Sequence, residues 1–119
     1  SSTLPASLGT SLTTLEYLWL HNNALSGTVP STFGALTNLR DAQLNQNKLE
    51  GSLPSELNQW TKLASLALQS NAFTGSIPYL EGLTNLEYLF FQDNKFSEGI
   101  PYSLFRLRNL GRSGNGIAT

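Results

Sequence analysis

The five prolines of this chain recur at nearly equal intervals. Pro5, Pro30, Pro54, Pro78 and Pro101 are separated by 25, 24, 24 and 23 residues, and the chain contains no other proline. A fixed interval of this length indicates a repeated structural unit. Two further residue types keep the same interval: asparagines at positions 23, 47, 71 and 94, and leucines at positions 15, 39, 63 and 86. The chain is therefore predicted to stack copies of one short unit.

Composition limits the classes of partner. The chain has 119 residues, of which 39% are hydrophobic, and a net charge of −1. A nearly balanced charge argues against nucleic acid or an anionic membrane as the partner. No apolar run approaches the roughly 18–20 residues that span a bilayer. Cysteine is absent, so neither a disulfide nor a thiolate metal site is expected, and no Asn-x-Ser/Thr sequence is present.

Within one unit the stretch LEYLWLHNN, residues 15–23, predicts a short strand. Leu18 and Leu20 point to one side, whereas Tyr17, Trp19 and His21 point to the other. So short a strand is not stable alone. Stacked on copies of itself it gains backbone partners on both sides, and a parallel sheet results.

The turn after each strand is predicted to be held by an asparagine. The side-chain amide of asparagine can satisfy backbone groups that a bend leaves unpaired. This predicted structural ladder consists of Asn23, Asn47, Asn71 and Asn94. Glycines at positions 27, 51 and 75 then permit a tight backbone, and an apolar-Pro pair holds the extended segment that follows.

These residues resemble the plant-type leucine-rich repeat, LxxLxxLxLxxNxLxGxIPxxLGx. Residues 12–35 follow this pattern closely, and the resemblance extends over about residues 4–110. It implies a leucine-rich-repeat solenoid, a curved right-handed superhelix. The concave face would carry a parallel sheet of short strands and the convex face mostly irregular or 3-10 turns. It also implies recognition of peptides, proteins or small hormones, as in plant-type receptor kinases and polygalacturonase-inhibiting proteins.

One domain, residues 1–119, is predicted. It comprises a partial repeat 1–11, then repeats 12–35, 36–59, 60–82 and 83–106, and a degenerate partial repeat 107–119. Solenoid ends need caps, and no cysteine-bearing cap is present at either end. We therefore expect a segment of a longer chain, or a subunit whose uncapped ends are covered by partners.

The outward strand positions predict three columns across the concave face. They are Tyr17, Asp41, Ser65 and Tyr88; then Trp19, Gln43, Ala67 and Phe90; then His21, Asn45, Gln69 and Gln92. Exposed aromatic side chains flanking amides are typical of recognition surfaces. The predicted partner contacts are all of these except Ser65 and Ala67. The alternative is that the aromatic side chains only cover the ends of the solenoid.

Two functions remain from the sequence. The first is a non-catalytic module that recognises a protein or peptide. The second is a structural or accessory subunit, held permanently in a larger assembly that is membrane-associated through its partners. The resemblance implies an extracellular or membrane-associated protein, although the missing cysteine caps and glycosylation sequences argue against an ordinary secreted receptor. Neither a catalytic motif nor a cofactor or metal site is expected.

A third class, ice binding, is disfavoured. Hydroxyl side chains flank the glycines at Ser26, Thr28, Ser52, Thr74 and Ser76. Such a row would present a flat face to ice, but Glu50, Glu98 and Gly99 interrupt it.

Overall fold

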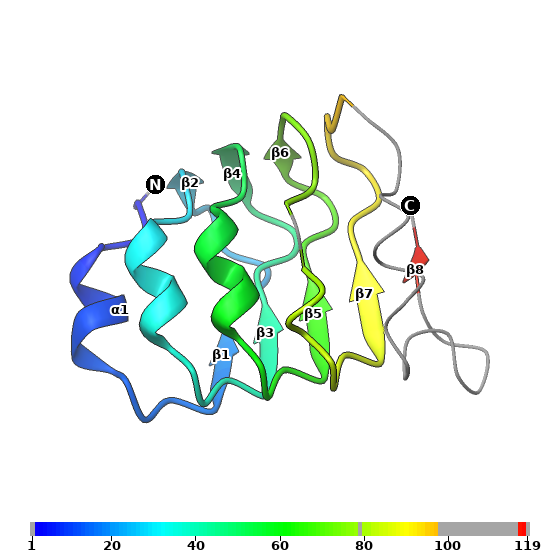
Figure 1. Cartoon of the computed structure of the whole chain (residues 1–119). Helices are drawn as coiled ribbons and strands as arrows, with labels where there is room; N and C mark the ends of the chain where they lie inside the picture. Colours follow the sequence, from blue (N-terminus) through cyan, green and yellow to red (C-terminus); the bar gives the residue numbers. More distant parts are fainter. Residues whose placement is uncertain (1, 79, 98–116, 119) are drawn as a thin grey trace.

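The computed structural model describes residues 2–78, 80–97 and 117–118 as a stack of coils (Figure 1). The coils of residues 12–35 and 36–59 each run through a strand of one sheet, a strand of a second sheet and a short 3-10 helix. The described residues of the coil 60–82 form the two strands and turns but no helix. The elements are α1 (Ser7–Ser11), β1 (Tyr17–Trp19), β2 (Ser26–Gly27), η1 (Ser31–Ala35), β3 (Asp41–Gln43), β4 (Lys48–Gly51), η2 (Ser55–Gln59), β5 (Ser65–Ala67), β6 (Ala72–Phe73), β7 (Tyr88–Phe90) and β8 (Ile117–Ala118).

Two parallel sheets run along the stack. The longer has the order β1-β3-β5-β7-β8 and the shorter the order β2-β4-β6. Because adjacent strands come from successive coils, every pairing is parallel. Among β1, β3, β5 and β7 the equivalent residues of successive coils pair with one another. The predicted leucine-rich-repeat fold is confirmed in its short parallel strands and its 3-10 turns.

The third side of the stack is made by α1, η1 and η2, which lie next to one another (Figure 1). Pro30 and Pro54 stand immediately before the two 3-10 helices, with φ of −66° and −72°. Proline suits this place because its fixed φ matches the extended entry and its missing donor costs nothing there. The first helix, α1, is a single α-helical turn where an irregular or 3-10 turn was expected.

The core lies between these three sides. Each coil contributes inward-facing leucines, and Phe33, Trp60 and Phe73 are the largest side chains that are fully buried. No one coil could enclose these residues. The apolar stripe is continuous along the stack, so each coil buries its neighbours.

Asparagine side chains join successive coils at the turn after each strand of the longer sheet. Asn47 Oδ1 accepts the backbone N–H of Leu25 from the preceding coil at 3.1 Å. Its Nδ2 donates to the carbonyl of Leu20 in that coil and to two carbonyls of its own turn. Asn71 and Asn94 repeat this arrangement one and two coils further on. Asn23 bonds only carbonyls of its own turn.

The partial coil at residues 2–11 covers the shorter sheet and leaves the longer one open. Thr3 forms a parallel bridge with Ser26, whose N–H donates to the carbonyl of Ser2 at 2.8 Å. No described strand lies beyond β1 on its other side.

The opposite end of the longer sheet carries β8, which pairs with β7 through Leu89 and Phe90. The prediction placed no strand there. Most of the predicted repeat 83–106 is described up to residue 97, whereas the rest of it and most of the degenerate repeat 107–119 lie outside the described residues. None of the described helices is long and apolar enough to cross a membrane.

Candidate recognition face on the longer sheet

The register of the longer sheet aligns the predicted columns across four coils. Tyr17 pairs with Asp41, which pairs with Ser65, which pairs with Tyr88. The second column follows in the same strands, as Trp19, Gln43, Ala67 and Phe90. Side chains at alternate positions of a strand share a face, so both columns lie on the side opposite the leucine core.

The third column continues this alignment beyond the strands. Backbone N–H groups donate to the carbonyls of its members: Asn22 to Asn45 at 3.1 Å, Gln46 to Gln69 at 2.9 Å and Ser70 to Gln92 at 3.0 Å. His21 is the member of this column in the first coil. All four members are partly buried.

Aromatic side chains dominate the β1 end of this face. Tyr17 is 55% exposed and Trp19 58% exposed, and with Leu12 they are the exposed large hydrophobic residues of the described chain. Their rings are in contact, with centroids 5.7 Å apart at an angle of 59°. Tyr88 and Phe90, at the other end of the columns, are partly buried. Between the two ends Ala67 is only 6% exposed, so its small side chain does not project from the middle of the second column.

Asp41 links the two columns through one oxygen of its carboxylate. The indole N–H of Trp19 donates to Oδ2 at 3.0 Å, and the amide of Gln43 donates to the same oxygen at 3.2 Å. The carboxylate therefore holds the exposed Trp19 ring by its polar edge. No hydrogen bond is made to the second oxygen, Oδ1.

Unpaired polar atoms gather on this face. Among the described residues the solvent-shielded side-chain atoms without a hydrogen-bond partner are His21 Nδ1, Asp41 Oδ1, Asn45 Oδ1, Gln69 Oε1 and Gln92 Oε1. All five belong to the three columns. Elsewhere in the described chain the shielded side-chain polar atoms are paired, as buried polar groups normally are. The face is therefore rich in hydrogen-bonding capacity that the protein does not use internally.

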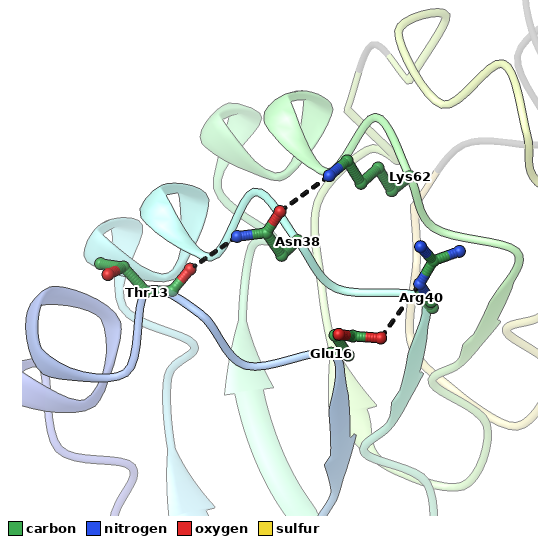
Figure 2. A network of polar contacts seen from close by, with 5 residues as sticks. All are labelled: Thr13, Glu16, Asn38, Arg40 and Lys62. Carbon is green, nitrogen blue, oxygen red and sulfur yellow. Dashed lines mark hydrogen bonds and ion pairs between the residues drawn. The ribbon is translucent and has the colours of Figure 1, made fainter.

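A second polar ladder lies beside the face, where each coil enters its strand (Figure 2). Asn38 Nδ2 donates to the carbonyl of Thr13 at 3.1 Å, and Lys62 Nζ donates to Asn38 Oδ1 at 2.9 Å. Glu16 and Arg40 form an ion pair at 3.1 Å nearby. Sequence reasoning missed this ladder, although the recurrence of Thr-Asn-Leu at 37–39 and 84–86 and of Thr-Lys-Leu at 61–63 carries its signal.

Chemical machinery is not apparent on this face. The described residues contain no group of three or more His, Asp or Glu side chains that could hold a metal ion. His21, the one histidine of the chain, has no hydrogen bond to its Nδ1. The arrangement of rings, amides and one carboxylate suits binding through contact and hydrogen bonds.

Comparison with known proteins identifies the repeat. The leucine-rich-repeat family model matches residues 14–36 and 85–107. No curated protein sequence matches the chain significantly. Solved structures of plant leucine-rich-repeat receptors do match it, at 30–38% identity.

Three of these solved structures illustrate the similarity. A plant peptide hormone receptor, RGFR1 in complex with RGF2, is 38% identical with a TM-score of 0.88, over 92% of this chain and 18% of that one. The Arabidopsis receptor kinase HAESA, in complex with the peptide hormone IDA and the co-receptor SERK1, is 31% identical with a TM-score of 0.84, over 99% and 20%. A plant ice-binding protein is 30% identical with a TM-score of 0.85, over 98% and 39%. The chain thus spans well under half the length of each.

Proposed function

We propose that this leucine-rich-repeat chain is a non-catalytic recognition module that binds a peptide or protein on the concave face of its longer sheet. The observation that carries the proposal is the exposure of Tyr17 and Trp19 beside columns of unpaired polar atoms. Aromatic side chains bury much area at low entropic cost, and amides fix the orientation of a partner. The similar receptors RGFR1 and HAESA are in complex with peptide hormones, which supports the same class of partner.

The proposed contact residues are those of the three columns except Ser65 and Ala67: Tyr17, Trp19, His21, Asp41, Gln43, Asn45, Gln69, Tyr88, Phe90 and Gln92. Their common property is an outward position on the longer sheet. The asparagines of the turns are excluded, because Asn47, Asn71 and Asn94 use both ends of their amides to join coils.

Peptide binding by three substituted proteins, two altered on the concave face and one control, tests the proposal. Trp19→Ala and Phe90→Ala each remove a ring from the concave face, whereas Glu50→Ala removes an exposed side chain from β4 in the other sheet. We expect binders selected from a peptide library on the unaltered chain to lose at least tenfold in affinity on Trp19→Ala and to keep it on Glu50→Ala. Binders that tolerate both ring substitutions equally would refute a concave recognition face.

A permanent place in an assembly is the second candidate, and one observation favours it. Leu12 is 47% exposed at the end of α1, and no described strand lies beyond β1. Exposed apolar residues and open sheet edges are each typical of surfaces that another chain or coil covers. Cross-linking from residue 12 in the native source separates the two candidates, because an assembly subunit gives one stable partner and a free recognition module gives none.

Ice binding by the shorter sheet is not proposed, despite the similarity to a plant ice-binding protein. Thr28, Ser52 and Ser76 are exposed along that sheet. Lys48 and Glu50, however, are also exposed on its central strand β4, and these charged side chains interrupt the hydroxyl surface.

A further inference from the structure

Asp41 is the only charged residue among the twelve positions of the three concave columns. The cationic side chains of the described chain are Arg40, Lys48, Lys62 and Lys95, and none of them is in a column. Arg40 precedes Asp41 but bonds Glu16 through its Nε. No side chain in the described part of the chain donates to Asp41 Oδ1. The concave face therefore holds one negative charge whose hydrogen-bonding capacity is half used.

We propose that Asp41, together with the rings of Tyr17 and Trp19, forms a subsite for a lysine or arginine side chain of the bound peptide. This inference rests on the proposed function, because it names the chemistry of a ligand at that same face. It states that the partner carries a positive charge opposite the β1 end of the columns.

The unpaired carboxylate oxygen of Asp41 favours a ligand group that donates a hydrogen bond. A shielded acceptor without a partner raises the free energy of the unbound protein, and a donor from the ligand removes that cost. Oδ1 is covered by its surroundings in the unbound chain. A donor reaches Oδ1 when the carboxylate turns about its broad terminal torsion, and the bonds from Trp19 and Gln43 to Oδ2 must shift with it.

The neighbouring rings favour a cation over a neutral donor. Tyr17 and Trp19 are each more than half exposed, with centroids 5.7 Å apart. A guanidinium or ammonium group over such ring faces is attracted by their negative potential. Trp19 is also held in place by its bond to Asp41 Oδ2, so the ring and the carboxylate are already oriented together. A charge-assisted bond to Oδ1 is about twice as strong as a neutral one.

The remaining unpaired atoms do not discriminate between a cationic and a neutral ligand group. Asn45, Gln69 and Gln92 carry amides, which present either an acceptor or a donor when their terminal group turns. A carboxylate accepts at both oxygens in either orientation. Asp41 is for this reason the position at which the face specifies the sign of its ligand.

A peptide selection followed by paired binding measurements tests the inference. Linear peptides from an unbiased display library are selected on the complete 119-residue chain. The binders are then measured against Asp41→Asn, which keeps the shape and the acceptor for Trp19, and against Glu50→Gln, which removes the same charge from the other sheet. We expect the binders to contain arginine or lysine, to bind Asp41→Asn about tenfold or more weakly, and to bind Glu50→Gln unchanged.

Replacement of the selected arginine by the neutral isostere citrulline completes the cycle. The subsite predicts the same loss on the unaltered chain and no further loss on Asp41→Asn. The indole N–H signal of Trp19 in NMR spectra should shift when the arginine peptide is added, with the buried Trp60 as an internal reference.

The two possible failures are distinguishable. If the binders depend on Trp19 and Phe90 but tolerate citrulline, or bind Asp41→Asn equally, the cation subsite is wrong and the recognition face stands. If no binder depends on Trp19 or Phe90, the recognition face is wrong and the subsite falls with it.

Discussion

At the scale of single residues, the hydrogen bonds of Asn47 are expected to contribute strongly to the stability of the fold. It is the one buried polar residue of the described chain, and its amide makes four hydrogen bonds, two within its own turn and two to the preceding coil. Asn47→Ala leaves the backbone N–H of Leu25 without its acceptor. We expect a loss of about 1–3 kcal/mol in the free energy of unfolding, measured by urea denaturation.

Asn23→Ala is the matched control for that substitution. Asn23 occupies the same place in the first coil, but it is exposed and bonds only the carbonyls of Leu20 and His21. Its replacement should cost less than about 1 kcal/mol, because water can replace both bonds. Equal losses at the two positions would show that the bonds between coils contribute nothing of their own.

Gly51 is the residue at which a side chain meets both strain and a clash. Its φ is +78°, and an added Cβ would lie 2.8 Å from Cγ2 of Thr28 in the preceding coil. Gly75 has a similar φ of +74° with more space, 3.3 Å to Cβ of Ser52. Gly51→Ala should therefore destabilise more than Gly75→Ala, for which we expect about 1–2 kcal/mol from backbone strain alone. In thermal unfolding, adding Thr28→Ser should recover the difference, and a failure to recover it would refute the clash.

At the scale of elements, Trp60 joins the two 3-10 helices. It follows η2 in a position where the neighbouring coils have Leu36 and Leu83, it is fully buried, and its indole N–H donates to the carbonyl of Phe33 in η1 at 2.7 Å. Trp60→Leu would leave a cavity and would remove one of the two hydrogen bonds that the carbonyl of Phe33 accepts, the other coming from the N–H of Leu36. The expected loss is about 2–4 kcal/mol in urea denaturation.

Fluorescence provides the check on that prediction. With Trp19→Phe in the background, the remaining tryptophan should emit as a buried indole until the chain unfolds. Emission typical of an exposed indole, or a loss below about 1 kcal/mol for Trp60→Leu, would contradict the packing.

The sequence allowed the strands and the concave columns to be predicted because the repeat keeps a constant phase. Once Leu18 is assigned to the core, Tyr17 and Trp19 must face outward, and the parallel register then aligns their equivalents. The repeat pattern does not carry side-chain orientation, so the bond from Trp19 to Asp41 was not foreseen. Trp60 was missed for the same reason, since a tryptophan in a leucine position gives no indication of its hydrogen bond.

Two backbone features were also missed. The positive φ values at Asn22, Gln46, Ser70 and Asp93 recur in every complete turn, but no single residue type marks the position. The bridge of Thr3 to Ser26 belongs to a partial coil, in which the repeat pattern has no strand to predict.

At the scale of the whole molecule, stability should fall from the middle of the stack towards β1. The amides of Asp41, Ser65 and Tyr88 donate to the carbonyls of Glu16, Arg40 and Ala64 in the preceding coils. Tyr17 holds the same place in the first coil, and no described strand lies beyond it to accept its amide. Hydrogen exchange in the complete chain should therefore be at least about 100-fold faster at Tyr17 than at Asp41, because a solenoid opens from its uncovered end.

If the Tyr17 amide is protected, the dependence of its protection on protein concentration shows what covers β1. If Tyr17 is as protected as Asp41 and its protection declines on tenfold dilution, a second copy of the chain covers β1. If the protection does not change on dilution, residues of the same chain cover that edge and the open-edge argument for an assembly is wrong. Fast exchange at Tyr17 together with slow exchange at Asp41 and Ser65 would show that the open edge persists in solution, where it is accessible to another strand.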